Sequence, residues 1–162
     1  MLRKANKKRF LHILFVLILS LPVAGFAQTK TFIQKFKPLA DSLSREYGIP
    51  TAIILGVSII ESSSGTSKNC KLLNNYFGME GKNELKKKGK KSRYRAYPDA
   101  RASFLHFCKV ISKKKYYKKL KGNMHYKLWT ASMSAHGYSE VPAVWQQRIN
   151  EVIRKNKLST TP

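Results

Sequence analysis

The chain has 162 residues, enough for one domain around one hydrophobic core, and its 43% hydrophobic content is ordinary for a globular protein. Its charge is not ordinary, because 32 Lys and Arg face 8 Asp and Glu and give a formal net charge of +24. Such a surface seeks polyanions such as nucleic acid, anionic lipid or an acidic cell-wall polymer. The sequence holds no C-x-x-C, H-E-x-x-H or phosphate-loop pattern and its four histidines are scattered, so we predict no metal site and no cofactor.

Residues 1–27 have the organisation of a secretory signal peptide. A basic start precedes an apolar run from Phe10 to Leu21, Pro22 is expected to break the helix, and Gly25 and Ala27 supply small residues for cleavage. Cleavage before Gln28 removes five positive charges and no negative ones, which leaves +19. The alternative is an uncleaved membrane anchor, although the apolar run is short for a full span. Export disfavours a nucleic-acid partner and favours a polymer of the cell envelope.

The first helix of the exported part is predicted over Thr31 to Tyr47, with apolar residues at helical spacing and Gly48 at its C′ position. Pro38 is a candidate break after a short first turn. The Ile49-Pro50 pair predicts an extended link, with Thr51 as a candidate N-cap of the next helix. We expect this first helix to serve packing.

The stretch from Ile53 to Gly81 carries the main candidate for chemistry. Ile53, Val57 and Ile60 are spaced to share one helix face, and Glu61 falls on or beside that stripe in the last turn. Apolar surroundings and the negative end of the helix dipole both raise the pKa of a carboxyl group there. A carboxylic acid kept protonated near neutral pH can act as a general acid. The alternative is a glutamate that simply turns outward into water.

The remaining chain predicts three more helices. One runs from Ala100 to Lys113, with Asp99 as N-cap and Phe104 on its apolar stripe. A second contains Trp129 and ends near Gly137, and the third is a closing amphipathic helix. The apolar positions of these helices are Phe104, Phe107, Cys108, Ile111, Leu128, Trp129, Met133, Val144, Ile149, Val152 and Ile153.

The chain has two cysteines, Cys70 and Cys108. An exported compartment permits a disulfide between them. Two separate buried thiols are the equally open alternative.

Several short motifs resemble those of bacterial N-acetylglucosaminidase domains, the peptidoglycan-cleaving modules of autolysins and flagellar muramidases. Residues 61–67, E-S-S-S-G-T-S, resemble the family's E-S-x-W-G-x-S, with Ser64 in place of the usual Trp. Residues 74–78 resemble N-N-x-F-G, and residues 47–50 resemble the Y-G-I-x-P that opens the catalytic helix. The similarity runs from about Phe32 to Lys157. The missing Trp removes an aromatic sugar platform from one subsite.

The resemblance implies a mainly α (α+β), lysozyme-like helical domain over residues 31–158, with a short β-hairpin and a tail at 159–162. The hairpin would lie between Gly81 and Arg93, and residues 94–97 resemble its return strand, F-R-x-Y. Here the hairpin is short.

The resemblance also assigns site residues. Glu61 would be the catalytic acid, and Tyr138, where the family has G-Y-A, would lie in the cleft near it. The substrate-binding cleft floor would be Asn75, Tyr76, Phe77 and Gly78. A second catalytic carboxylate is expected on the hairpin, where Glu84 is nearest to the family's position and Glu80 is the alternative.

The function implied is hydrolysis of β-1,4 bonds in peptidoglycan after N-acetylglucosamine, by an exported protein in the periplasm or at the cell surface. Its partners would be peptidoglycan glycan strands and anionic envelope polymers, without nucleic acid and without a stable membrane span after signal cleavage. Two alternatives remain at this stage: a lytic transglycosylase, which forms an anhydro-sugar, and a non-catalytic wall-binding module. The sequence leaves the oligomeric state unknown.

Overall fold

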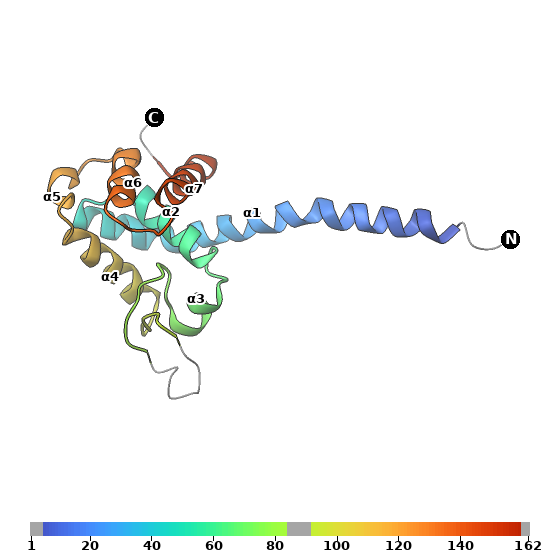
Figure 1. Cartoon of the computed structure of the whole chain (residues 1–162), viewed down its shortest axis with the longest axis horizontal. Helices are drawn as coiled ribbons and strands as arrows, with labels where there is room; N and C mark the ends of the chain where they lie inside the picture. Colours follow the sequence, from blue (N-terminus) through green and yellow to red (C-terminus); the bar gives the residue numbers. More distant parts are fainter. Residues whose placement is uncertain (1–4, 84–91, 160–162) are drawn as a thin grey trace.

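The computed structural model describes residues 5–83 and 92–159. Its helices in chain order are α1 (Ala5–Tyr47), α2 (Thr51–Ser62), α3 (Lys68–Leu73), α4 (Ala100–Ser112), α5 (Tyr117–Leu120), α6 (Tyr126–Ala135) and α7 (Pro142–Lys155). The helices after α1 gather around the C-terminal part of α1, whose N-terminal part extends beyond them (Figure 1). The predicted mainly helical fold class is confirmed. No helix in the described ranges is long and apolar enough to cross a membrane.

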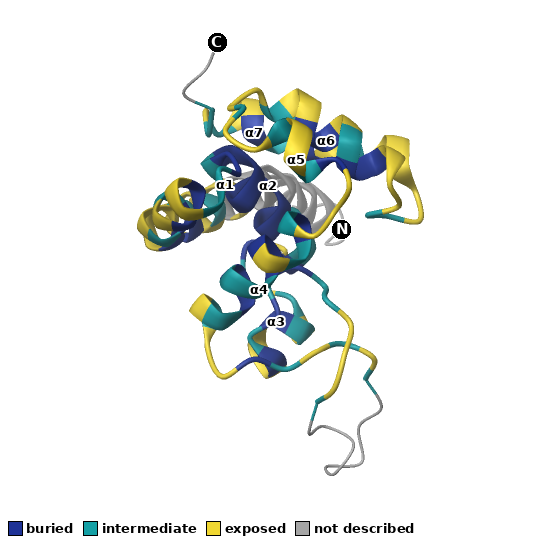
Figure 2. Cartoon of the chain, turned by 90° about the vertical axis from the view of Figure 1, so that its left-hand side faces the viewer, coloured by how far each residue is buried: buried dark blue, intermediate teal, exposed yellow. Residues whose placement is uncertain are grey.

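Helix α2 forms the centre of the core. Its residues from Ala52 to Ile59 are all buried, and Figure 2 colours it almost entirely as buried. Glycine at position 56 allows α7 to approach closely, because a Cβ there would lie 2.8 Å from Ile153 Cγ1. The sequence predicted one buried stripe, whereas α2 is buried on all sides because it packs against α1, α6 and α7.

Helix α1 differs from its prediction, because it continues through both Pro22 and Pro38 instead of breaking. A proline inside a helix removes one backbone donor and crowds the preceding turn. Around Pro38 the buried residues Phe36, Ala40 and Leu43 offset this cost by packing into the core. The predicted end at Gly48 is confirmed, since Gly48 has φ +64° and donates its N–H to Ser44 O at 2.8 Å.

Two N-caps were predicted, and one of them is wrong. Pro50, not Thr51, is the N-cap of α2. Thr51 lies inside the first turn, where its hydroxyl donates to Asp41 Oδ1 at 2.8 Å. Asp99 is the N-cap of α4 as predicted, and its Oδ1 accepts from the Ala102 N–H at 2.8 Å.

The predicted hairpin is reduced, within the described residues, to one antiparallel bridge between Glu80 and Tyr94. Backbone hydrogen bonds from Gly81 N to Arg93 O at 2.9 Å and from Arg95 N to Met79 O at 2.8 Å hold its two arms together. Cys70 and Cys108 are separate buried thiols, so the structure has them unbonded.

Candidate active site

Glu61 lies in the last turn of α2, as predicted, and the chain turns sharply after it. Ser63 and Ser64 adopt left-handed φ values of 51° and 53°, which ends the helix. The Ser62 hydroxyl fixes this turn, because it donates to Ser58 O at 2.6 Å and accepts from the Gly65 N–H at 2.8 Å. The turn holds the Glu61 side chain at the end of a rigid, buried helix.

The Glu61 carboxyl group lies between the closing helix and the loop after α3. Trp145 of α7 donates its indole N–H to Glu61 Oε1 at 2.8 Å. On the other side, a Cβ placed on Gly78 would lie 3.5 Å from Glu61 Oε2, so the backbone of Gly78 borders the carboxyl group. Gly78 has φ +65°, a left-handed conformation that favours glycine at this position.

The environment of Glu61 favours its protonated form. Burial raises the pKa of this carboxyl group above its usual value, while the Trp145 hydrogen bond and the charge of Arg148 act in the opposite direction. Burial is the largest of these effects. A partly buried carboxyl with a raised pKa and one fixed oxygen has the properties of a general acid.

Tyr138 lies beside this group. Its ring centroid is 4.8 Å from that of Trp145 and 6.3 Å from that of Phe107. Its hydroxyl oxygen is buried and has no hydrogen-bond partner among the described residues. Burial, followed by the charges of Glu61, Tyr116 and Tyr97, raises the pKa of Tyr138 well above its usual value. The hydroxyl is therefore a neutral, unsatisfied polar group close to Glu61.

The predicted cleft-floor residues divide into two groups. Asn75 is 1% exposed, and its side chain bonds to the Met79 and Arg95 backbones, so it braces the loop against the hairpin arm. Phe77 stacks on Phe107 in the core, with centroids 4.2 Å apart. Of the four predicted substrate-binding residues, Gly78 is the one whose backbone the structure places against Glu61.

Tyr76 points toward α1 instead. Its ring packs against Phe32, Phe36 and Phe104, and it shares a side-chain hydrogen bond with Cys70. Burial raises the pKa of its hydroxyl to about 12.

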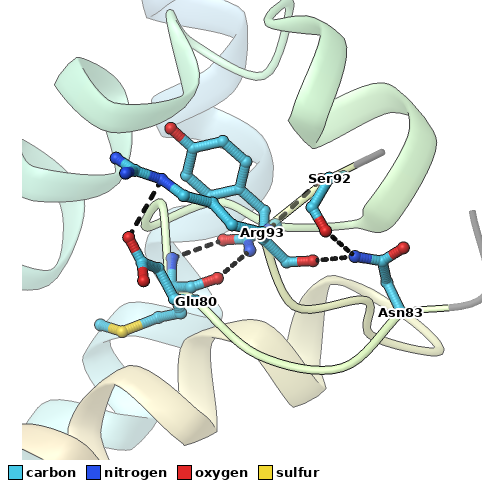
Figure 3. A network of polar contacts seen from close by, with 7 residues as sticks. Glu80, Asn83, Ser92 and Arg93 are labelled. Atoms are coloured by element: carbon cyan, nitrogen blue, oxygen red, sulfur yellow. Dashed lines mark hydrogen bonds and ion pairs between the residues drawn. The ribbon is translucent and has the colours of Figure 1, made fainter. Parts of the chain in front are cut away.

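Glu80 lies two residues after Gly78, at the foot of the hairpin. Figure 3 shows its carboxylate reaching back to Arg93, with Oε1 3.1 Å from Arg93 Nε. In the same network Asn83 donates to the backbone oxygens of Ser92 and Tyr94, which fixes the two arms to each other. Glu84, the other predicted hairpin carboxylate, lies outside the described residues.

Ser64, which replaces the family's Trp, is buried under the start of the packed part of α1. Its hydroxyl lies 2.9 Å from Thr29 Oγ1, and its carbonyl accepts from Gln28 Nε2 at 3.4 Å. Ser64 therefore packs the turn after α2 against α1. A hollow of about 520 Å³ lies elsewhere and is lined by His125, Tyr126, Lys127, Ile153, Arg154, Lys157 and Ser159. Glu61 does not line that hollow. We therefore identify the candidate active site from the Glu61 carboxyl group and its neighbours, not from the position of a hollow.

Sequence reasoning missed the two α7 residues that act on Glu61, namely Trp145 and Arg148. Neither residue was given a role when the closing helix was predicted. An available signal was that a buried indole N–H requires an acceptor. The sequence holds few carboxylates that could provide one.

Comparison with protein families shows a match over residues 37–158 to the family Glucosaminidase, described as mannosyl-glycoprotein endo-beta-N-acetylglucosaminidase. A comparison with curated proteins found no match.

Several solved structures are similar in fold. The catalytic domain of the autolysin Auto from Listeria monocytogenes has a TM-score of 0.67 at 21% identity, over 81% of this chain and 85% of that one. A glycoside hydrolase domain of FlgJ from Salmonella typhimurium scores 0.63 at 16% identity, over 82% and 99%. A mutant peptidoglycan hydrolase from Sphingomonas sp. A1 scores 0.63 at 17% identity, over 79% and 94%. At these identities the likeness shows the shared lysozyme-like fold.

Proposed function

The chain belongs to the glucosaminidase family and is a glycoside hydrolase; from this premise we propose that it hydrolyses peptidoglycan at the β-1,4 bond on the reducing side of N-acetylglucosamine, with Glu61 as general acid. The observation that carries the proposal is the Glu61 carboxyl group, partly buried, bordered by Gly78 and hydrogen-bonded by Trp145. The similarity to the Auto autolysin domain and to the Sphingomonas peptidoglycan hydrolase supports peptidoglycan as the substrate class.

In the proposed reaction Glu61 donates its proton to the glycosidic oxygen as the bond to the anomeric carbon breaks. Trp145 holds one carboxyl oxygen, which leaves the other, on the Gly78 side, to face the leaving oxygen. Water completes the hydrolysis by adding its hydroxyl to the anomeric carbon, and its proton returns, directly or through the second group, to the Glu61 carboxylate, which restores the acid. The group that stabilises or attacks the anomeric carbon is a hairpin carboxylate or the substrate's own 2-acetamido group.

The Tyr138 hydroxyl has a role in the same proposal. It is buried, unsatisfied and neutral beside Glu61, so a polar atom of the bound sugar would supply the hydrogen-bond partner that the described protein groups do not. Peptidoglycan strands and anionic envelope polymers are the proposed partners. Export through the segment at residues 1–27 is part of the proposal, and N-terminal sequencing of exported protein should find Gln28 first.

The test is a digest of purified sacculi with mass spectrometry of the released fragments. Hydrolysis gives fragments with a reducing N-acetylglucosamine end, whereas a transglycosylase gives anhydro-sugars lighter by one water. Glu61→Gln keeps shape and removes the proton, so it should reduce cleavage by about two orders of magnitude or more, because proton transfer contributes roughly 10²- to 10⁴-fold. The control is Glu151→Gln, which changes an exposed carboxylate paired with Lys155.

Two outcomes would contradict the proposal. A folded Glu61→Gln protein that cleaves at the parent rate removes Glu61 from the chemistry. A parent protein that binds sacculi without releasing fragments is a wall-binding module. Circular dichroism on the same preparations separates both from loss of fold.

A further inference from the structure

A basic surface forms where the return arm of the hairpin meets α4. We call the basic face the four residues Arg95, His106, Lys109 and Lys113. His106, Lys109 and Lys113 follow one another at spacings of three and four residues, so they share one side of α4 and its C-cap. Arg95, Lys109 and Lys113 are exposed, while His106 is partly buried between them. Three exposed cationic side chains therefore lie near one imidazole.

The centre of the basic face is fixed by contacts between the two elements. The Tyr97 hydroxyl lies 2.6 Å from His106 Nδ1, which ties the hairpin arm to α4. The Arg95 guanidinium lies 5.7 Å from the centroid of the Tyr97 ring, and its stem packs across Gly81. The stacked arginine and the tied imidazole are therefore held in place before any ligand binds.

The cations of the basic face lie close enough to affect the pKa of His106. Burial and then the charges of Arg95, Lys109 and Lys113 lower the pKa of His106 below its usual value. Nearby acids have other contacts: Glu80 pairs with Arg93, and Asp99 caps α4. An anion bound among these cations would be favoured by all of them.

The basic face also lies near the proposed catalytic group. The charges of Glu61 and Tyr97 both raise the pKa of Tyr138, so the Tyr138 hydroxyl is within electrostatic reach of both. On the backbone, Gly78 borders Glu61 and Gly81 packs against Arg95, three residues further along. A ligand on the basic face could therefore belong to the same strand whose bond lies at Glu61.

We infer that the basic face binds the free carboxylates of the peptide branches that peptidoglycan strands carry, and so orients the strand for cleavage at Glu61. This inference rests on the proposed function. The exposed guanidinium of Arg95 suits a carboxylate, because its planar fork can donate two parallel hydrogen bonds to one. Lys109 and Lys113 add charge that a flexible peptide branch can reach.

The experiment measures binding to sacculi by pull-down, separately from cleavage. The test variant is Arg95→Gln, Lys109→Gln and Lys113→Gln combined. The control, Lys115→Gln, Lys118→Gln and Lys119→Gln combined, removes the same charge from three exposed positions, one before α5 and two within it. Each protein is tested on untreated sacculi and on sacculi whose carboxylates have been coupled to methylamine with a carbodiimide, which makes them neutral amides.

We expect the test variant to bind untreated sacculi about tenfold more weakly than the parent, and the control variant to lose much less. On neutralised sacculi, parent and test variant should bind equally. Equal losses by the two triple variants would overturn the inference in favour of general charge attraction. Parent binding that survives neutralisation but disappears when phosphate-linked polymers are stripped from the sacculi would overturn the carboxylate assignment.

Cleavage on the same samples keeps the two proposals apart. A parent that cleaves, with a test variant whose KM rises while kcat is kept, supports both. A parent that binds through the basic face without cleaving contradicts the proposed hydrolysis and leaves the basic face supported. Circular dichroism and thermal unfolding of both triple variants confirm that the fold is retained.

Discussion

The indole nitrogen of Trp145 lies 2.8 Å from Glu61 Oε1, and this hydrogen bond joins residues 84 positions apart in the sequence. Glu61 comes from the buried central helix and Trp145 from the first turn of the closing helix. Because Trp145 is itself buried against Tyr138, its ring cannot easily turn away. Helix α7 therefore orients the candidate acid, and it lowers the pKa of Glu61 against the larger effect of burial.

The first prediction is that Trp145→Phe shifts the alkaline limb of the pH profile of kcat/KM to higher pH. Glu61 must be protonated to act as an acid, so activity falls as pH rises through its pKa. The Trp145 hydrogen bond lowers that pKa, and its removal lets the pKa rise further. Loss of orientation should also reduce kcat by about tenfold at the optimum.

The matched control is Trp129→Phe. Trp129 is fully buried in α6 and donates its indole N–H to Asn123 O at 2.7 Å. This change also removes one buried indole donor, and we expect it to lower stability without moving the alkaline limb. An unmoved limb in Trp145→Phe, or equal shifts in both variants, would contradict the role given to the Trp145 hydrogen bond.

The second prediction concerns Tyr138→Phe, which should separate stability from activity. A buried hydroxyl without a partner costs about 1–3 kcal/mol of desolvation, so its removal should leave the free energy of unfolding unchanged or raise it. Activity on sacculi should fall by about tenfold if a substrate atom is the missing partner. Urea unfolding and fragment release are measured on one preparation. A destabilised Tyr138→Phe with full activity would show that the hydroxyl serves the fold instead.

The fold class followed from the family resemblance, whereas the placement of Glu61 at a helix end followed from local sequence. The apolar run from Ile53 to Ile60 and the turn residues after Glu61 determine a helix end without help from distant residues. The same holds for Gly48, which ends α1, and for Asp99, which caps the start of α4, because each acts within one helical turn.

The surroundings of Glu61 could not be predicted in the same way. The Trp145 contact depends on how α7 packs on α2, which is a long-range result of Gly56 and Ile153 fitting together. Thr51 was wrongly given the N-cap because its hydroxyl had a competing partner, Asp41, on another helix. Pro38 was a candidate helix break, yet α1 continues through it because the core packing of α1 offsets the cost of the proline.

The third prediction is that Glu61→Gln is more stable than the parent at neutral pH. Burial raises the folded-state pKa of Glu61 above its ordinary 4.5. Below pH 4.5 the group is protonated in both the folded and unfolded states and imposes no cost. Above pH 4.5 the unfolded state releases its proton while the folded state still holds it, so stability falls until the pH has passed the folded-state pKa. Glutamine does not titrate, so the stability difference between variant and parent should grow from acid to neutral pH.

Urea unfolding at several pH values measures this difference. Glu151→Gln is the control of opposite sign, because Lys155 lowers the pKa of the Glu151 carboxyl group. Removal of that carboxylate should give no gain at neutral pH. A Glu61→Gln gain that is the same at pH 4 and pH 7 would mean that the carboxyl group is not responsible.

The fourth prediction concerns the second catalytic group, for which Glu84 and Glu80 are the hairpin candidates. Arg93 pairs with the exposed Glu80 carboxylate, so Glu80 also has a role in holding the arms together. We expect Glu84→Gln to lower kcat by about tenfold without abolishing it, because a nearby carboxylate helps to stabilise the positive charge of the transition state. Glu80→Gln should have a smaller effect, and Arg93→Gln serves as its control for loss of the ion pair.

The anomeric configuration of the first product distinguishes the possible mechanisms, and proton NMR of a fresh digest measures it. A carboxylate acting as general base on water gives inversion, whereas attack by the substrate's 2-acetamido group gives retention. We expect inversion together with the loss of kcat in Glu84→Gln. Full activity in both Glu84→Gln and Glu80→Gln, with a retained configuration, would exclude both hairpin carboxylates. In that case Glu61 would act as the acid while the substrate supplies its own nucleophile, and the short hairpin would serve binding alone.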